Sequence, residues 1–551
     1  MDLILSREPS ADPVTVVSMK STVWRIWAIV AVVGLIATAT ALVVTQRSDG
    51  GDTASDHPDP TQTSPAANLP DPVLADGPTG DLQTVPQVTT WEPADGPGWA
   101  PSDTTRVVTE SGSDATGAAD RLADDLSVDR ADDGARASDV LLTIDPNAGT
   151  GPEGYSLTTR DHQVTITAET GAGAFYGTRT LVQSVRADGG LPEGSVQDAP
   201  DREQRGLMLD TARKFYSAAW IEERLHELAD LKLNEFHLHF SDDQGFRIES
   251  ESHPEIVSRE HLTKDEVTSI VELAESLHIT VIPEIDSPGH LGAVLDANPD
   301  LQLKRADGSV SEGAIDISNP DSAALIDDLL REYAPLFPGA YFHVGGDEYP
   351  ALYASDPEAT YPNLARAAEE QYGAGATVRD LATGWINDRA ATARELGKTP
   401  QVWNDGMHAG GKVQPSEDRQ VTYWTGREIG AREPQEYLDQ GFPLINLNSA
   451  YLYYVLGEPN EFTYPTGEAI YNEWTPDVVR GSTALPEGQG GPQNVLGARF
   501  AIWCDLADAQ TPEQVAEGIR LPLAAMAQKT WHAGEPSGTW AEFTQRVDDV
   551  G

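Results

Sequence analysis

Apolar and polar residues follow two different patterns along the chain, and the change falls near residue 200. Before it, short alternating runs at 139–144 and 163–167 predict strands, and helical spacing at 118–126 and 174–185 predicts two helices. Residues 91–200 are therefore expected to form a small α/β domain.

After residue 201, short β-rich runs alternate with longer helical runs. The predicted strands are 206–212, 235–240, 280–285, 341–344, 401–403, 420–424, 444–447 and 498–503. The predicted helices are 219–231, 264–277, 322–333, 378–396, 434–439 and 512–530, and the last is expected to close the series. Eight strands, most of them followed by a helix, predict a parallel (β/α)8 TIM barrel for residues 201–551.

The N-terminal region contains an uncharged run, 26–46, that is long enough to span a bilayer. Lys20 and Arg25 precede this run, so the positive-inside rule places the rest of the chain outside. The run exceeds a usual signal-peptide core but ends in small residues, so residues 1–47 are interpreted as an export signal or a single transmembrane anchor. Met19 would begin a more ordinary export signal.

Residues 48–90 are rich in Asp, Pro, Thr, Ser and Gly, which predicts an extended linker. The expected location of the folded part is therefore extracellular or at the cell surface, secreted or anchored, with membrane contact only through the N-terminal segment.

The charge balance excludes one class of partner. There are 88 Asp and Glu against 37 Lys and Arg, which gives a formal net charge of -51. A surface this negative repels nucleic acid and anionic lipid, so nucleic-acid binding is set aside. Cys504 is the only cysteine, so neither an intramolecular disulfide nor a cysteine-based metal site can form.

Polar and aromatic residues follow the predicted strand cores, at the end of a parallel barrel where sites are built. They are Asp210, Arg213, Asp242, Asp243, Glu284, Asp286, Asp347, Glu348, Trp403, Asp405, Trp424, Tyr451, Trp503 and Asp505.

The sharpest signal is the run His-Val-Gly-Gly-Asp-Glu at 343–348. Its two glycines allow a tight turn that presents the adjacent carboxylates of Asp347 and Glu348 to one cavity. In the alternative interpretation, these two carboxylates only cap the following helix.

Four ordered motifs carry a resemblance to family 20 glycoside hydrolases, the β-N-acetylhexosaminidases. They are RGLMLDTAR at 205–213, HFSDDQGFR at 239–247, PEIDSPGH at 283–290 and the run at 343–348. The resemblance implies a retaining hydrolase that removes terminal β-linked N-acetylhexosamine. In this family the substrate's own 2-acetamido oxygen attacks C1 and forms an oxazolinium intermediate.

The same resemblance implies roles for the catalytic residues. Glu348 would protonate the leaving oxygen and later activate water, a double role that favours a raised pKa. Asp347 would hold the acetamide N–H and stabilise the developing cation. Tyr451 resembles the tyrosine that donates to the acetamide oxygen, with Tyr453 and Tyr454 as close rivals.

Further roles are implied around these residues. Asp242 and His290 resemble a pair that relays to Glu348. Substrate-binding residues would be Arg213 and Asp505, which contact hydroxyls, and three aromatic walls, Trp403, Trp424 and Trp503.

No metal and no cofactor is expected. His237 and His239 alternate on a strand, which would fit a metal site but also suits a packed barrel core. The expected partner is an oligosaccharide or polysaccharide that bears β-linked N-acetylhexosamine.

Several alternatives stay open. Many exo-acting relatives have Tyr-Leu-Asp where this chain has Tyr451-Leu452-Tyr453, so one hydroxyl-binding carboxylate is missing. The surrounding stretch resembles dispersin-like enzymes that cut β-1,6 poly-N-acetylglucosamine, and lacto-N-biosidases that release a disaccharide. A third alternative is a non-enzymatic glycan-binding protein on an inactive barrel. The intact Asp347–Glu348 pair argues against it, because a binding protein has no need of the acid.

Overall fold

The computed structural model describes residues 71–408, 410–425, 432–458, 462–534 and 537–551. The predicted N-terminal anchor or signal lies outside these residues, as does most of the predicted linker. Within the described ranges, every helix is too short or too polar to cross a bilayer.

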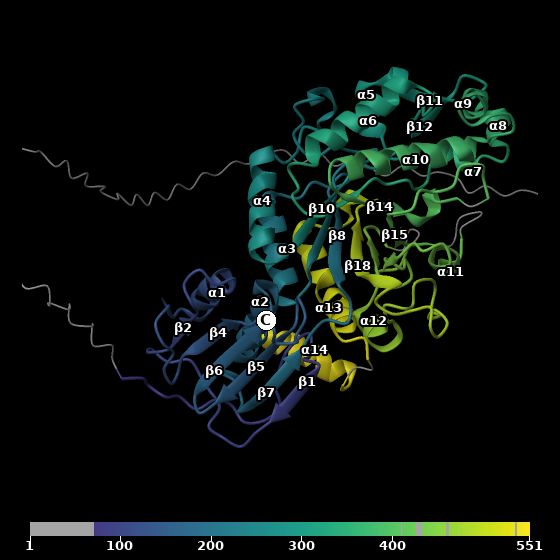
Figure 1. Cartoon of the computed structure of the whole chain (residues 1–551). Coiled ribbons are helices and arrows are strands. Elements are labelled where there is room, and N and C mark those ends of the chain that lie inside the picture. The colour runs from purple at the N-terminus through teal and green to yellow at the C-terminus, as the bar shows by residue number, and fades with distance from the viewer. Residues whose placement is uncertain (1–70, 409, 426–431, 459–461, 535–536) are drawn as a thin grey trace, which may run out of the picture. The chain divides into compact units, whose positions relative to one another are not determined.

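The small domain is a seven-stranded mixed sheet with two helices packed on it (Figure 1). In spatial order the strands are β1 (Thr90–Pro93), β7 (Gly194–Asp198), β5 (Tyr155–Arg160), β6 (Gln163–Ala168), β4 (Val140–Ile144), β2 (Arg106–Val108) and β3 (Asp129–Ala131). The helices are α1 (Thr116–Leu126) and α2 (Gly171–Asp188). Helix α2 approaches the sheet closely because Gly177 faces Ile166: a Cβ on this glycine would lie 2.6 Å from that side chain.

The small domain begins before residue 91. Val85 is fully buried, and its backbone N–H donates to the Gln183 side chain at 2.7 Å. Burial and long-range hydrogen bonding are features of a packed segment, so the last residues of the predicted linker belong to this domain.

The second domain is a closed barrel of eight parallel strands, as predicted. In order around the barrel they are β8 (Gln204–Asp210), β9 (Glu235–His239), β10 (Thr280–Glu284), β13 (Tyr341–His343), β14 (Thr399–Trp403), β15 (Gln420–Tyr423), β16 (Leu444–Asn446) and β18 (Val495–Trp503). Pairing of β16 with β18, and of β18 with β8, closes the ring.

The larger predicted helices form within about two residues of their expected bounds. They are α3 (Ala218–Asp230), α4 (Lys264–Ser276), α6 (Pro320–Tyr333), α10 (Val378–Glu395), α11 (Pro434–Leu438) and α13 (Pro512–Trp531). Side-chain caps fix several helix starts. Thr263 caps α4 and Thr377 caps α10, each in a reciprocal capping box.

Additional elements lie between and after those predicted. They are the hairpin β11 (Gln302–Lys304) and β12 (Val310–Ile315), the strand β17 (Tyr453–Val455), and the helices α5 (Gly292–Ala297), α7 (Pro350–Tyr353), α8 (Pro357–Thr360), α9 (Pro362–Tyr372), α12 (Gly467–Glu473) and α14 (Trp540–Val550). The expectation that the helix at 512–530 closes the series is wrong, because α14 follows it and packs on α2, α12 and α13.

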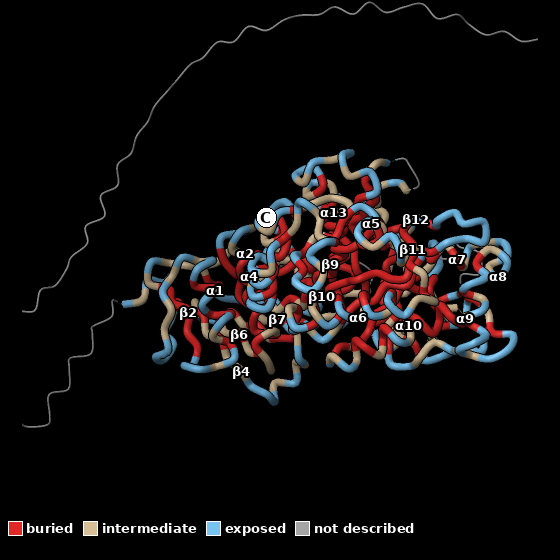
Figure 2. Tube along the Cα trace, turned by 90° about the horizontal axis from the view of Figure 1, so that it is seen from above, coloured by how far each residue is buried: buried red, intermediate tan, exposed pale blue. Residues whose placement is uncertain are grey.

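The barrel interior is buried along its whole length (Figure 2). Near the N-terminal ends of the strands, Arg499 forms an ion pair with Glu235 at 2.8 Å. At the same end the Gln420 side-chain oxygen accepts from Gln204 at 3.1 Å and from Gln401 at 2.7 Å. These groups fill the lower barrel, and the chemistry described below lies at the opposite ends of the strands.

A buried ion pair joins the two domains. Lys232, which follows α3, lies 3.0 Å from the Asp198 carboxylate at the end of β7, and both side chains are fully buried. The Asp198 carboxylate also accepts from the Tyr155 hydroxyl at 2.6 Å and from the Trp531 indole at 2.9 Å. The charges at this interface are therefore matched by hydrogen-bonded partners.

Candidate active site

The turn after β13 brings the two adjacent acids into one place. Gly345 and Gly346 have φ values of 70° and 114°, which residues with a side chain rarely adopt. A Cβ on Gly345 would lie 1.7 Å from an oxygen of Asp286, so only glycine fits there. Glu348 itself has φ 47°, an uncommon conformation for a non-glycine residue.

His290 contacts both carboxylates. Its Nε2 atom lies 3.6 Å from Asp347 Oδ2 and 3.5 Å from Glu348 Oε2, and its Nδ1 atom lies 3.3 Å from Asp242 Oδ1. The two neighbouring acids therefore share one compartment, as the motif predicts. Asp242 and His290 lie in the order expected for a relay to Glu348.

The charge state of Glu348 differs from the expectation. The imidazole of His290, 3.5 Å away, lowers the pKa of Glu348, whose side chain is 49% exposed. Burial alone would lower the pKa of His290, but the carboxylates of Asp242 and Asp347 outweigh burial and raise it well above its ordinary value. The expected rise for Glu348 is wrong because a charged imidazole, from a different strand end of the barrel, lies beside it.

The raised carboxyl pKa belongs to Asp347. Burial and the nearby charge of Asp286 raise the pKa of Asp347 well above its ordinary value, and burial raises that of Asp286 to about 7. Carboxylate oxygens of both residues and a nitrogen of His290 lie within 4.8 Å of one another. Asp347 Oδ1 and Asp286 Oδ2 are buried without a hydrogen-bond donor among the described residues. His290 Nε2 and Trp503 Nε1 are also buried without a partner among the described residues, so both donors and acceptors are left open here.

Arg213 is held by acids on both sides. Its guanidinium lies 3.0 Å from Asp210 and 2.8 Å from Asp242, and 5.3 Å from the ring centre of Trp503. Asp505 is exposed near Arg213, and partial burial raises its pKa although the charge of Arg213 opposes the rise. Both residues therefore remain candidates for contacts with sugar hydroxyls.

The three predicted tryptophans belong to one cluster of packed aromatic rings, here called the aromatic pocket. Trp403 is fully buried at its base, and its ring centre lies 5.9 Å from that of Trp503. Trp424 stacks on Tyr453 with ring centres 5.6 Å apart and an angle of 8° between the planes. The pocket is apolar on its walls and acidic at Asp347.

Tyr453, and not Tyr451, belongs to this pocket. The Tyr453 ring lies between those of Trp424 and Trp503, and burial together with the charges of Asp347 and Asp405 raises its pKa well above its ordinary value. The Tyr451 hydroxyl instead donates to Glu473 at 3.2 Å. A turn at residues 449–451 ends the regular alternation of the chain and directs the two tyrosines to different surroundings.

Comparison with known proteins identifies the family. A model of the catalytic domain of glycosyl hydrolase family 20 matches residues 203–534, more than half of the chain, and a model of domain 2 of the same family matches 81–199. The chain belongs to glycosyl hydrolase family 20.

Curated relatives fall within the same family. A lacto-N-biosidase of Bifidobacterium bifidum is 32% identical over 479 residues, which cover 85% of this chain and 41% of that protein. A β-hexosaminidase of Porphyromonas gingivalis is 32% identical over 453 residues, covering 75% and 55%. A β-N-acetylhexosaminidase of Cellulomonas fimi is 27% identical and is covered over 93% of its length. The chain thus spans only about half of the first two relatives.

Solved structures share the two-domain architecture. The Flavobacterium johnsoniae chitobiase is 25% identical, with a TM-score of 0.70 and coverage of 85% of this chain and 72% of that one. The β-N-acetylhexosaminidase of Streptomyces coelicolor has a TM-score of 0.68 at 24% identity, which supports the fold alone.

Beneath the pocket of this family 20 domain, Glu284 organises three histidines. One of its oxygens lies 2.6 Å from Trp403 Nε1 and 3.1 Å from His343, and the other lies 2.7 Å from His239 and 3.0 Å from His237. His237, Glu284 and His343 have the atom types of a metal site. Trp403 Nε1 donates to one oxygen of Glu284 and His239 Nδ1 hydrogen-bonds to the other, so the arrangement also works as a hydrogen-bonded floor that orients Trp403. That no metal is needed stays a prediction.

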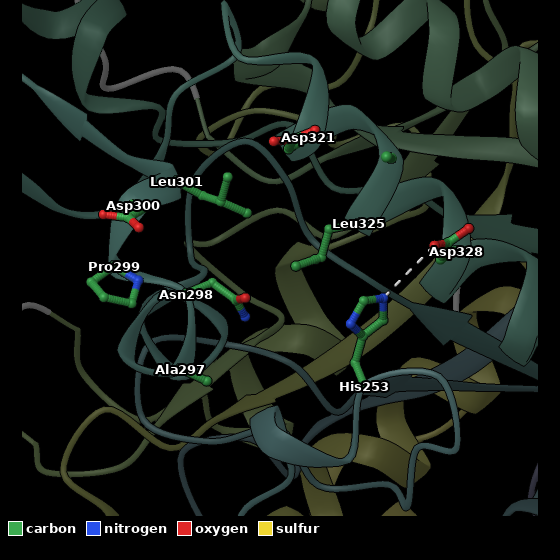
Figure 3. Close-up of a pocket in the computed structure, with 10 residues that line it drawn as sticks. His253, Ala297, Asn298, Pro299, Asp300, Leu301, Asp321, Leu325 and Asp328 are labelled. Atoms are coloured by element: carbon green, nitrogen blue, oxygen red, sulfur yellow. Dashed lines mark ion pairs between the residues drawn. The ribbon is translucent and has the colours of Figure 1, made fainter.

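A separate cleft lies away from the family 20 pocket (Figure 3). It is lined by the loop around His253, by residues 297–301 and by one face of α6. His253 lies 3.9 Å from Asp328 there. None of the predicted site residues lines this cleft.

Proposed function

We propose that the protein is a retaining hydrolase that removes terminal β-linked N-acetylhexosamine with help from the substrate's own acetamido group. The observation that carries this proposal is Asp347 Oδ1, a buried carboxylate oxygen without a donor among the described residues, in a pocket walled by aromatic rings. An acetamide group supplies both missing parts, an N–H donor for the carboxylate and a methyl group for the apolar walls.

In the proposed reaction, Asp347 passes its proton to the neighbouring carboxylate of Asp286, accepts from the acetamide N–H and turns the acetamide oxygen toward C1. The Tyr453 hydroxyl, which burial keeps protonated by raising its pKa, donates to that oxygen. Attack on C1 builds positive charge on the acetamide, and the carboxylate of Asp347 stabilises this charge in a site with little water.

Glu348 is the proton donor in this proposal, and His290 supplies its proton. The charged imidazole lies 3.5 Å from the Glu348 carboxylate. A bound sugar covers Glu348 and removes water from it, which raises its pKa and draws the proton from His290. Glu348 then protonates the leaving oxygen, and as a carboxylate it removes a proton from the water that opens the oxazolinium ion.

Release of a disaccharide is the second candidate. The similarity to a lacto-N-biosidase covers 85% of this chain. On the pocket side formed by β17, Tyr453 and Val455 are buried in the aromatic cluster and provide no carboxylate for a terminal hydroxyl. Such a wall favours a substrate in which a further sugar occupies this side.

The test uses the purified chain with aryl β-N-acetylglucosaminide, aryl β-N-acetylgalactosaminide, aryl lacto-N-bioside and β-1,6 poly-N-acetylglucosamine, and with aryl β-glucoside as a control. We expect cleavage only of N-acetylated substrates, inhibition by a thiazoline mimic of the oxazoline, and loss of at least about 1,000-fold in kcat for Glu348→Gln. Equal cleavage of the glucoside, or indifference to the thiazoline, would refute the acetamido mechanism.

We also propose that the folded part lies outside the cell, on the basis of the uncharged run at 26–46. Protease treatment of intact cells that express the full chain tests this location, because only an external domain is digested.

A further inference from the structure

One buried carboxylate connects the aromatic wall of the pocket to the backbone of the proton donor. Asp405 lies in a single helical turn, Asn404–Gly406, directly after β14, and its side chain is buried. Its Oδ1 atom accepts from the Trp424 indole N–H at 2.9 Å. Its Oδ2 atom accepts from the backbone N–H of Glu348 at 3.0 Å and from the Tyr353 hydroxyl at 3.0 Å.

The backbone at Glu348 needs such a support. Its φ of 47° lies in the left-handed region, which a residue with a side chain keeps only where the surroundings hold it. The turn that carries Asp405 packs directly on the glycine turn, because a Cβ on Gly406 would lie 2.2 Å from the carbonyl oxygen of Gly346. The position of Asp405 is therefore fixed relative to Glu348.

We propose that Asp405 is a positioning residue that couples Trp424 to Glu348, so that seating the acetamide group against Trp424 and orienting the proton donor are one event. This inference rests on the proposed function. The loops after β13 and β15 are separate in sequence, and in the described part of the chain Asp405 hydrogen-bonds to both.

A carboxylate is required for this coupling. Asp405 offers an acceptor oxygen on each side, whereas an asparagine of the same shape offers one oxygen and one NH2 group. In Asp405→Asn the NH2 group must face either the Trp424 indole N–H or the Glu348 N–H, and two facing donors repel each other. The substitution therefore breaks one side of the connection and leaves the packing volume unchanged.

The experiment is a double-mutant cycle on aryl β-N-acetylglucosaminide, with Asp405→Asn, Trp424→Phe and the double variant. Phenylalanine keeps an apolar wall but has no N–H, so in the double variant the asparagine NH2 can turn toward the phenyl ring and its oxygen can again accept from Glu348. We expect kcat/KM to fall about 100-fold for Asp405→Asn and about tenfold for Trp424→Phe. The double variant should be no worse than Asp405→Asn alone.

A matched control removes a different donor from the same carboxylate. Tyr353→Phe deletes one hydrogen bond to Oδ2 and leaves both ends of the coupling intact, so its kcat/KM should change by less than about threefold. Affinity for the thiazoline should fall with kcat/KM in Asp405→Asn and stay near wild type in Tyr353→Phe. The melting temperature of each variant separates these effects from unfolding.

Two outcomes of these measurements would contradict the coupling through Asp405. If the losses of the two single substitutions multiply in the double variant, or if Tyr353→Phe is as damaging as Asp405→Asn, Asp405 does not couple Trp424 to Glu348. Wild-type activity on N-acetylated substrates tests the proposed function separately, so an active wild type with a multiplicative cycle overturns only this inference.

Discussion

The pKa values of buried carboxyl groups shift in opposite directions at two places in this protein, the domain interface and the pocket. At the domain interface, burial alone would raise the pKa of Asp198, but Lys232 and several hydrogen bonds outweigh burial and lower it. In the pocket, Asp286 and Asp347 are buried beside each other and their pKa values are raised. The two places differ in the countercharge and donors that surround the acids. Both oxygens of Asp198 accept hydrogen bonds, whereas one oxygen each of Asp286 and Asp347 has no donor among the described residues.

The largest effect is expected from a substitution of Asp347 in the pocket. Asp347→Asn keeps the shape but removes the carboxyl group that becomes the acceptor for the acetamide N–H, and we expect kcat/KM on an N-acetylated aryl glycoside to fall about 100- to 1,000-fold. Because the substitution also removes repulsion with Asp286, the melting temperature should stay the same or rise. A variant that retains activity and melts at a lower temperature would contradict this assignment of Asp347.

A substitution at the domain interface should lower stability and leave catalysis unchanged, the opposite of the result expected for Asp347→Asn. Lys232→Met leaves Asp198 buried without its cation, and we expect about 3–5 kcal/mol less free energy of unfolding. Denaturant unfolding measures this loss, and the exposed Lys304→Met is the matched control. The folded fraction of Lys232→Met should keep kcat/KM within about twofold of wild type, since the hydrogen bonds of Lys232 go to Tyr155 and Asp198, away from the pocket. A large loss of kcat/KM at full folding would break the comparison.

The two tyrosines sharpen the outline of the pocket. Removing the hydroxyl of Tyr453 should lower kcat/KM about 10- to 100-fold, because a donor to the developing charge is lost. Tyr451→Phe removes only a contact with Glu473 and should change kcat/KM by less than about threefold. If Tyr451→Phe instead lowered kcat/KM more than Tyr453→Phe, Tyr451 would be the donor to the acetamide oxygen, as the sequence motif predicts.

The smallest effect is the pH dependence of stability. The pKa of Asp286 is raised from 3.8 to about 7. Between these values only the folded chain holds the proton, so this group's contribution to stability is complete below about pH 4 and is lost as the pH rises toward 7. Asp198 has a lowered pKa and contributes in the opposite direction, with its stabilisation lost in acid. The wild-type melting temperature should therefore fall relative to Asp286→Asn between about pH 4 and about pH 7.5.

Much of the barrel could be predicted from the sequence because each strand is a short apolar run with polar residues at its end. The missed elements had weaker patterns. Strand β17 has three residues and follows a turn, and α14 follows a segment with Gly534 and Gly538 that is typical of a chain end rather than of a new helix.

The site could be predicted where one local motif carries it. The glycine turn brings Asp347 and Glu348 together beside His290. The choice between Tyr451 and Tyr453 could not be made, because both fall on the same side of a regular strand and only the turn before β17 separates them. The direction of the pKa shift of Glu348 depends on His290, which the fold brings from another strand end.

Helix α14 has a consequence for how the chain is made. It packs on α2, a helix near the start of the described chain, and Arg546 next to this contact reaches the Gln83 side chain at 3.3 Å. Because synthesis proceeds from the N-terminus, the surface of α2 that α14 covers stays exposed until the whole barrel has been translated. A chain that is truncated before residue 540 contains all the barrel strands but lacks α14. Its first domain would still expose apolar surface to chaperones and proteases.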